Sequence, residues 1–325
     1  MKIFSADGGG YLGLATAAFI TETERHFQTR FCDSFELFCG TSTGAIVALG
    51  LASGMTGSEI TDLYETLGRE VFKNRFRWYR FARFPRGLFI ALYSNVPLRK
   101  ALNDAFGDAT VGSLLEKGKK VLVTSFSVTN GKPRVFKTDH SPELTRDNGY
   151  FLKDIALASA AAPFYFPVVR LTCPNTGTVE SFCDGGVYAN HPALIGFIEA
   201  ISHLKSNADD VSVLSLSTPR SDIGQPDAGL GWLQRQVLSR GLFFWRTSVF
   251  NMMIDGTSEI AHQSLLRLID WNLGEKSRYQ RISFPKPKGL EMDIADARAT
   301  ATLKQLGSTC AHDGPTRNRI SQFFN

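Results

Sequence analysis

The 325-residue chain is 43% hydrophobic and 21% charged, as expected of a globular protein that can bury a large core without cross-links. Its formal net charge of +5 does not by itself indicate nucleic-acid binding, but it favours contact with anionic surfaces such as phospholipid headgroups. The five cysteines form no C-x-x-C pair, which argues against a zinc site or a disulfide framework and fits a reducing compartment.

The N-terminal sequence has no apolar stretch long enough for a signal peptide. A run of about 18 apolar residues, the length that a membrane-spanning helix needs, does not occur in the sequence. We therefore expect a cytoplasmic protein that associates peripherally with membranes.

Short apolar runs and helical periodicity alternate from the start of the chain. An apolar run at 2–6 predicts a buried strand, and the spacing of apolar residues predicts a helix over 11–27. A second strand is predicted over 35–39, followed by a helix over 45–52 that Gly54 ends.

The alternation continues through the middle of the chain. Further strands are predicted at 120–128, 134–137, 179–183 and 211–216, and further helices at 151–162 and from just after His191 to about 204. This order indicates an α/β fold whose central, mainly parallel sheet is flanked by helices. We expect one domain over 1–325, with a recognisable core at about 3–220 and a mostly helical portion over 221–325.

Ser42 lies in a G-x-S-x-G sequence, Gly40-Thr41-Ser42-Thr43-Gly44, between a predicted strand and a predicted helix. A nucleophile elbow needs this setting, because small flanking glycines let the strand and the helix pass close together and leave the serine exposed. The N-terminal end of the helix favours the negative charge that develops there. The motif also occurs by chance in tight turns, so alone it does not establish catalysis.

Three consecutive glycines, Gly8, Gly9 and Gly10, follow the first predicted strand. Their unobstructed backbone N–H groups suit an anion cradle, which in an acyl hydrolase would hold the oxygen of the tetrahedral intermediate. One such donor is typically worth about 10²–10³ in rate.

The same loop also fits the dinucleotide fingerprint G-x-G-x-x-G through Gly8, Gly10 and Gly13. A nucleotide-binding fold expects an acidic residue at the end of the second strand, where it holds the ribose. Asp33 and Glu36 lie before or within that strand instead, which weakens the nucleotide interpretation without removing it.

Asp184 ends a predicted strand and is followed by Gly185 and Gly186. A carboxylate within hydrogen-bonding distance can take the proton of a serine hydroxyl. An Asp-Gly hairpin turn is the plainer interpretation of this sequence on its own. A histidine triad is disfavoured, because none of the histidines after Asp184 lies in a distinctive motif: His191, His203, His262 and His312.

Four ordered blocks resemble the patatin-like phospholipase family. They are the glycine-rich loop, the G-T-S-T-G sequence about thirty residues later, the segment 158–167 that matches A-S-x-A-x-P-x-x-F-x-P, and the distant D-G-G. The resemblance covers roughly residues 3–220, and four blocks in order are far more specific than any one of them.

The resemblance implies a three-layer patatin-like fold and a phospholipase A-type activity on membrane glycerophospholipids. It makes Ser42 the nucleophile, Asp184 its partner in a Ser-Asp dyad, and Gly8 to Gly10 the oxyanion hole. Gly40, Gly44, Gly185 and Gly186 would support these motifs. Neither a metal nor another cofactor is expected.

One departure from the family pattern is Leu12, which stands where the family usually has Arg or Lys. It removes a charge that could hold the oxyanion loop or meet a headgroup. The Tyr-Leu form of the loop is similar to bacterial patatin-like proteins of antiphage defence that are activated by cyclic nucleotides. A cyclic nucleotide activator is therefore an expected partner.

Residues 72–86 interleave basic and aromatic side chains and contain no acidic residue. Aromatic rings suit the bilayer interface, and nearby Arg and Lys gain about 1 kcal/mol each from anionic lipid. We predict a cap beside the active site that contacts the membrane or covers the lipid cleft, through Arg77, Trp78 and Arg80. A helix packed on the core and an oligomer contact are the alternatives.

The expected partners are thus a phospholipid membrane surface and a cyclic nucleotide, with no nucleic-acid polymer, since no nucleic-acid module surrounds the basic segment. The sequence is compatible with a homo-oligomer. Two other functions stay open at this point: a nucleotide-binding regulatory module built on the Gly8–Gly13 loop, and a catalytically silent patatin-like domain used for binding.

Overall fold

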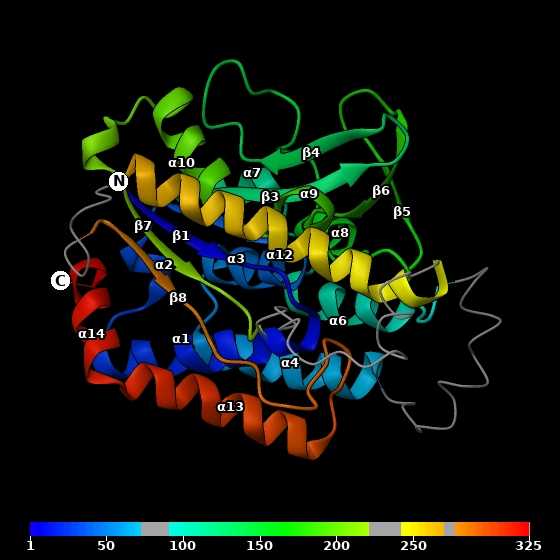
Figure 1. Cartoon of the computed structure of the whole chain (residues 1–325). Coiled ribbons are helices and arrows are strands. Elements are labelled where there is room, and N and C mark those ends of the chain that lie inside the picture. The colour runs from blue at the N-terminus through cyan, green and yellow to red at the C-terminus, as the bar shows by residue number, and fades with distance from the viewer. Residues whose placement is uncertain (73–90, 221–241, 270–276, 325) are drawn as a thin grey trace.

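A single mixed sheet organises the protein, for which a computed structural model describes residues 1–72, 91–220, 242–269 and 277–324, with the backbone alone for 242–251. Within these residues the sheet has eight strands in the order β5-β6-β3-β2-β1-β7-β8, and β4 pairs with β3 (Figure 1). The parallel strands are β1 (Lys2–Ala6), β2 (Leu37–Thr41), β3 (Lys120–Ser127), β7 (Ser212–Leu216) and β8 (Tyr279–Ile282). The antiparallel strands are β4 (Lys132–Lys137), β5 (Val169–Thr172) and β6 (Val179–Asp184).

Helices cover both faces of this sheet, so the layers are helix, sheet and helix. On one face lie α1 (Leu14–Phe27), α3 (Thr43–Ser53), α4 (Gly57–Val71), α6 (Val96–Phe106), α8 (Leu152–Ser159) and α13 (Ala297–His312). On the other lie α10 (Ala193–Ser202) and α12 (Leu242–Leu268). Shorter segments complete the described chain: α2 (Phe31–Ser34), α7 (Val111–Glu116), α9 (Gly186–Ala189), α14 (Gly314–Ile320), and the 3₁₀ turns η1 (Gly10–Gly13), η3 (Ala208–Asp210) and η5 (Ser321–Phe323).

The period of two along each strand divides the apolar side chains between two cores. In β1, Phe4 packs into the core shared with α1 and α3, whereas Ile3 packs into the core shared with α10 and α12. Phe38 and Leu37 of β2 divide in the same way. The predicted α/β architecture, a mainly parallel sheet flanked by helices, is therefore confirmed.

The observed elements differ from the predicted ones in several places. The helix predicted over 11–27 begins as the 3₁₀ turn η1, and the strand predicted at 35–39 lies at Leu37–Thr41. The helix predicted over 151–162 ends earlier, at Ser159. Strand β8 was not predicted, because Gln280 and Arg281 interrupt its apolar pattern although both are buried or nearly so.

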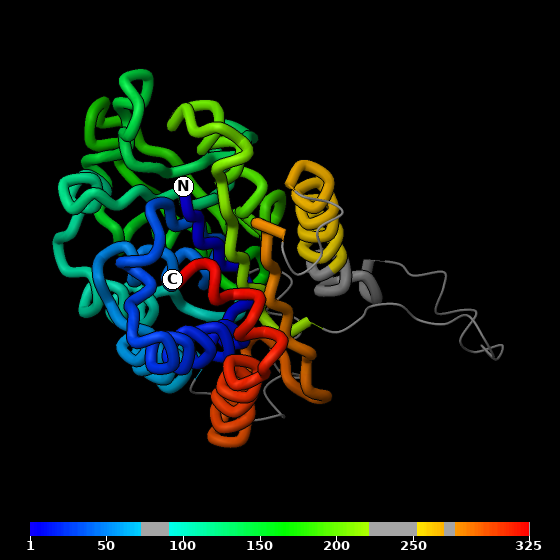
Figure 2. Tube along the Cα trace, turned by 90° about the vertical axis from the view of Figure 1, so that its left-hand side faces the viewer, coloured from blue at the N-terminus to red at the C-terminus, as the bar shows by residue number. Residues whose placement is uncertain are grey.

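The C-terminal ends of the parallel strands point to the right in Figure 1, away from the side on which both chain termini lie (Figures 1 and 2). Figure 2 also shows α12 on the flank of the sheet, and α13 beneath the body of the molecule, where it packs along α1. Among the described helices, none has both the length and the apolarity needed to cross a bilayer.

The close packing of α13 on α1 gives a first prediction. A Cβ atom added at Gly307 of α13 would lie 2.2 Å from the carbonyl oxygen of Ala15 and 2.8 Å from the amide nitrogen of Phe19, both backbone atoms of α1. Gly307→Ala should therefore lower the free energy of unfolding by roughly 1–3 kcal/mol, although alanine is the better helix former.

Gly256 of α12 is the matched control, because a Cβ atom added there meets nothing within 4 Å. Gly256→Ala should raise the free energy of unfolding by up to about 1 kcal/mol. Urea denaturation of both variants measures the difference. An increase in stability for Gly307→Ala would contradict the packing described for α1 and α13.

Candidate active site

The register of β3 brings Ser42 and Asp184 together. At the start of β3, the amide of Lys120 donates to the carbonyl of Glu36, just before β2, at 3.0 Å. Just after β3, the amide of Val128 donates to the carbonyl of Ser181 in β6 at 2.8 Å. The two donors are an even number of residues apart, so β2 and β6 pair with the same edge of β3.

These two strands approach each other along that edge from opposite directions. The last residue of β2, Thr41, pairs with Thr124, and the last residue of β6, Asp184, pairs with the next β3 residue, Ser125. The residue that follows β2 is Ser42, so it arrives beside Asp184. One parallel and one antiparallel pairing thus place side chains that are far apart in the sequence at one point.

Ser42 occupies a sharp turn between β2 and α3. Its backbone angles, φ 56° and ψ −127°, lie in a region that non-glycine residues rarely adopt and that costs of order 1–3 kcal/mol. The turn brings the helix against β1, since a Cβ atom at Gly44 would lie 2.3 Å from the carbonyl oxygen of Ala6. The strand-turn-helix geometry is that of a nucleophile elbow.

Ser159 fixes the backbone of this turn. Its hydroxyl accepts a hydrogen bond from the Ser42 amide at 2.8 Å and donates one to the carbonyl of Thr124 at 2.7 Å. Ser159 is fully buried and belongs to the segment 158–167 that the sequence singled out without a role. It therefore ties the turn to β3, the strand that positions Asp184.

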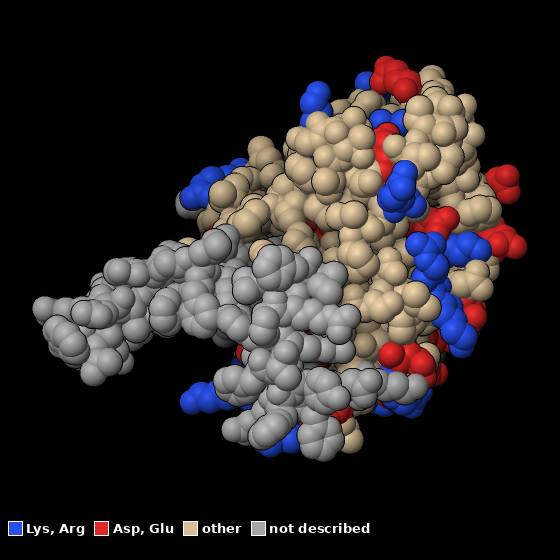
Figure 3. All heavy atoms as spheres, turned by 90° about the vertical axis from the view of Figure 1, so that its right-hand side faces the viewer, with Lys and Arg blue, Asp and Glu red and all other residues tan. Residues whose placement is uncertain are grey.

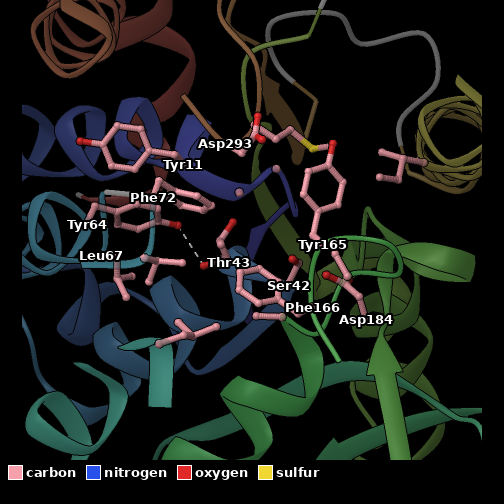
Figure 4. Close-up of a pocket in the computed structure, with 18 of the residues that line it drawn as sticks. Tyr11, Ser42, Thr43, Tyr64, Leu67, Phe72, Tyr165, Phe166, Asp184 and Asp293 are labelled. Carbon is pink, nitrogen blue, oxygen red and sulfur yellow. Dashed lines mark hydrogen bonds between the residues drawn. The ribbon is translucent and has the colours of Figure 1, made fainter. Parts of the chain in front are cut away.

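Asp184 is 2% exposed, and Figure 4 shows its side chain beside that of Ser42 at the wall of the same pocket. The amide of Gly186 donates to Oδ1 of the same carboxyl at 2.7 Å. Burial raises the pKa of Asp184 to about 7, and the nearby Ser42 hydroxyl and the hydrogen bond from Gly186 only partly oppose that shift. The carboxyl is thus set to exchange a proton near neutral pH.

The glycine-rich loop is held at most of its backbone groups. The amide of Asp7 donates to Leu216 O at 3.0 Å, and the amide of Tyr11 donates to Met292 O at 2.7 Å. The carbonyl of Gly8 accepts from Oγ1 of Thr218 at 2.8 Å. These contacts come from the end of β7 and from segments after it.

The three loop glycines are not equivalent. The amide of Gly8 donates to the carbonyl of Asn190 at 3.3 Å, so it is already engaged. Within the described part of the chain, the amides of Gly9 and Gly10 have no such partner, and both residues line the pocket that holds Ser42. The structure therefore supports an anion cradle at Gly9 and Gly10, with Gly8 as part of its frame.

A cavity opens beside Ser42 and Asp184 (Figure 4). Its walls are mostly apolar and aromatic, and α4, α6 and the segment 160–166 supply most of them. The apolar lining includes Tyr64, Leu67, Val71, Phe72, Leu98, Tyr165, Phe166 and Ile254. Such a lining suits a hydrocarbon chain.

The sequence missed several residues of this site. Asn190 is 1% exposed, lines the pocket and donates from Nδ2 to the carbonyl of Gly8 at 3.3 Å. Tyr64 is buried and donates to the carbonyl of Thr43, next to Ser42, at 3.0 Å. The sequence signal for Asn190 was its place shortly after D-G-G, and the signal for Tyr64 was the apolar periodicity of α4.

None of the four histidines considered for a triad lines the cavity. His191 is buried between Ser215 and the carbonyl of Ser258, and burial lowers its pKa to about 3. His262 bonds to the hydroxyl of Tyr279, His203 lies near Glu143, and His312 bonds to the carbonyl of Ser308.

The predicted contact residues Arg77, Trp78 and Arg80 lie outside the described residues.

Gly40 and Gly44 lie at the turn, and Gly185 packs against Thr124 of β3. Figure 3 shows the side of the molecule toward which the parallel strands point. The described part of this surface carries both basic and acidic residues.

Comparison with known proteins shows the family of the chain. The sequence model described as patatin-like phospholipase matches residues 4–197, so the chain belongs to this family. This confirms the family recognised from the sequence, and with it the predicted class of enzyme, a lipid esterase.

Two relatives are named cGAMP-activated phospholipase. The one from Escherichia coli (strain TW11681) is 33% identical over 233 residues, which are 68% of this chain and 63% of that protein. The one from Vibrio cholerae serotype O1 is 34% identical over 349 residues and covers 100% of this chain and 94% of that protein. The crystal structure of VipD from Legionella pneumophila is 14% identical, with a TM-score of 0.43, over 95% of this chain and 66% of that one.

Ser159 provides a test of how the elbow is held. Ser159→Ala removes the acceptor of the Ser42 amide and the donor to Thr124, and leaves both groups buried. We expect the free energy of unfolding to fall by about 1–3 kcal/mol and kcat on a short-chain ester to fall at least tenfold. Urea denaturation and steady-state kinetics check the two effects, and an unchanged kcat would show that the bond does not position Ser42.

The pKa of Asp184 predicts a pH dependence. Only the carboxylate form can accept a proton, so kcat/KM should rise with pH and level off above an apparent pKa of about 7. Because burial raises the folded-state pKa above the unfolded value, the stability that the protonated carboxyl contributes is lost as pH rises through about 7.

Asp184→Asn should therefore gain clearly more thermal stability relative to the wild type at about pH 8 than at about pH 5. Thermal melts at the two pH values measure this difference. An equal effect at both would mean that the carboxyl is not protonated preferentially in the folded state.

Proposed function

We propose that this protein is a phospholipase A-type lipid acyl hydrolase that cleaves acyl esters of membrane glycerophospholipids through an acyl-Ser42 intermediate. The observation that carries the proposal is the position of Ser42, in its strained turn, beside the buried carboxyl of Asp184 at the wall of an apolar cavity. A serine, a base and a lipophilic cleft are the three parts that this reaction needs.

In the acylation step, the Ser42 oxygen attacks the ester carbonyl carbon while Asp184 takes its proton. The negative oxygen of the tetrahedral intermediate lies toward the amides of Gly9 and Gly10. The amide of Thr43, in the first turn of α3, has no partner within its helix and offers a further donor. Collapse of the intermediate releases the alcohol, which takes the proton from Asp184.

In the deacylation step, the same carboxylate takes a proton from water as the water oxygen attacks the acyl-Ser42 carbonyl. The Ser42 oxygen leaves and recovers a proton from Asp184, and a fatty acid is released. Asp184 alternates between the two protonation states, so a pKa near 7 lets one carboxyl serve as base and then as acid.

The cavity favours a long acyl chain over a small ester. Its wall runs from Ser42 past Tyr64 and Leu67 of α4 to Leu98 of α6, and these surfaces are apolar. Burying methylene groups there is worth about 0.8 kcal/mol each, so chain length should improve kcat/KM until the cavity is filled.

The proposed regulation rests on the relatives. Both carry the name cGAMP-activated phospholipase, and the loop form with Leu12 favours the same group of bacterial antiphage-defence proteins. We propose that cGAMP or a related cyclic nucleotide raises the activity of this chain. Peripheral membrane binding through Arg77, Trp78 and Arg80 belongs to the same proposal.

Fatty-acid release from mixed phospholipid vesicles, measured with and without cGAMP, tests this function. The wild type should release fatty acid, faster with cGAMP, whereas Ser42→Ala and Asp184→Asn should lose at least about 10³-fold in kcat. His312→Ala is a matched control, because this exposed side chain does not line the cavity and its loss should leave turnover intact.

Undiminished release by Ser42→Ala would remove the proposed mechanism. A folded wild type without activity on any phospholipid, with or without cGAMP, would favour a catalytically silent binding domain instead.

A further inference from the structure

A buried charge cluster underlies the glycine-rich loop. The side chain of Asp7, the residue before the three glycines, is completely buried. Nη2 of Arg281 lies 2.6 Å from its Oδ2 atom, and Nη2 of Arg220 lies 3.1 Å from the same oxygen. These two guanidinium groups lower the pKa of Asp7, although its burial acts in the opposite direction.

The cations come from a part of the chain that the family's sequence model does not cover. That model ends at residue 197, whereas Arg220 follows β7 and Arg281 lies on β8. Position 12, where the family usually has a basic residue, holds Leu12, which is 3% exposed and packs in the hydrophobic core. In this chain the positive charge beside the glycine-rich loop is therefore supplied by Arg281 of β8, not by a residue of the loop itself.

Arg281 also fixes its own place in the sheet. Its Nη1 atom donates to the hydroxyl of Ser215 on β7 at 2.8 Å, and that hydroxyl bonds to Nε2 of His191 at 3.0 Å. The Arg281 side chain is 10% exposed, so it has little freedom to leave Asp7. A rigid guanidinium fork that holds two neighbours at once orients a carboxylate more firmly than a flexible ammonium group would.

Asp7 in turn sets the direction of the backbone that enters the loop. Its amide is bonded to β7, and Gly9 and Gly10, two and three residues later, line the cavity. An oxyanion donor is effective only when it is held in place before the charge develops. A small rotation at Asp7 would move both amides away from the intermediate.

We propose that Arg281, assisted by Arg220, is a positioning residue of the anion cradle, and that it acts through Asp7. The inference rests on the proposed function, because it assigns the two arginines to the transition state of that reaction. Arg220 extends the cluster to α12, since its Nη1 atom lies 3.7 Å from Oδ1 of Asp255.

A double-mutant cycle on the full chain tests this inference. Arg281→Gln and Asp7→Asn should each lower kcat about 10–100-fold on a short-chain ester and leave KM within about twofold, because they weaken binding of the transition state only. The double variant should lose no more than the worse single variant, because both substitutions break one interaction. Arg281→Lys should recover part of the loss.

Arg278→Gln is the matched control. Arg278 lies three residues before Arg281, just ahead of β8, and contacts the carbonyl of Ala208 at 2.9 Å and Asp209 at 3.7 Å. Its loss should leave kcat unchanged. Thermal unfolding of every variant shows whether that variant is folded. If Arg281→Gln does not fold, Arg281→Lys replaces it in the test, because lysine keeps the positive charge but lacks the two-pronged guanidinium group.

Three results would overturn the inference: a normal kcat in folded Arg281→Gln, a loss confined to KM, or losses that multiply in the double variant. The Ser42→Ala variant separates this failure from failure of the proposed function. If Ser42→Ala is inactive and Arg281→Gln is fully active, only the role of the cluster is wrong. If Ser42→Ala is active, the reaction itself has been misassigned.

Discussion

The pairing of β3 with two strands along one edge is the constraint on which the site depends. A parallel strand and an antiparallel strand that share an edge must end facing each other, and here they end at the consecutive residues Thr124 and Ser125. Because side chains alternate along a strand, a shift of one residue would turn Asp184 to the other face. The juxtaposition of Ser42 and Asp184 is thus a property of the sheet register rather than of either loop.

Several stabilising contacts hold features that are unfavourable by themselves. Ser42 keeps a strained backbone, and Asp184 keeps a carboxyl away from water, each at a cost to folding. The hydrogen bonds of Ser159 to the turn and to β3, together with the packing of Gly44 on β1, keep the turn in place. The raised pKa of Asp184 follows from the same burial, so the structural cost and the proton-transfer property have one physical origin.

The glycine-rich loop joins the two halves of the chain. Its sequence lies at the N-terminus, but its backbone is held by Leu216, Thr218 and Met292, and its entry by Arg220 and Arg281. A chain that kept only the region matched by the family model would lack all of these contacts. The C-terminal portion therefore contributes to the frame of the site as well as to the sheet.

Local patterns predicted much of this structure. The G-x-S-x-G turn, the strand before Asp184 and the mainly parallel sheet could be read from short segments, because periodicity and glycine spacing are local properties. Asp184 could not be told from a turn residue in that way, since its role depends on a register between β3 and β6. Arg281 was missed for a related reason: a charged residue in a short strand gives no apolar signal, and its partner Asp7 is 274 residues away.

Two expectations stay predictions. The contact segment with Arg77, Trp78 and Arg80 lies outside the described residues, and the assignment of Ser42 and Asp184 as a catalytic pair rests on geometry. Gly8 is the one predicted oxyanion donor whose amide is already bonded within the fold. That detail could not be seen in a run of three identical residues.

Peptide mapping after reaction with a long-chain fluorophosphonate tests the central claim most directly. The account predicts a single adduct on Ser42, formed by the wild type, lost in Ser42→Ala, and formed far more slowly in Asp184→Asn because the hydroxyl then lacks its base. An adduct on another serine, or labelling of Asp184→Asn at the wild-type rate, would contradict it.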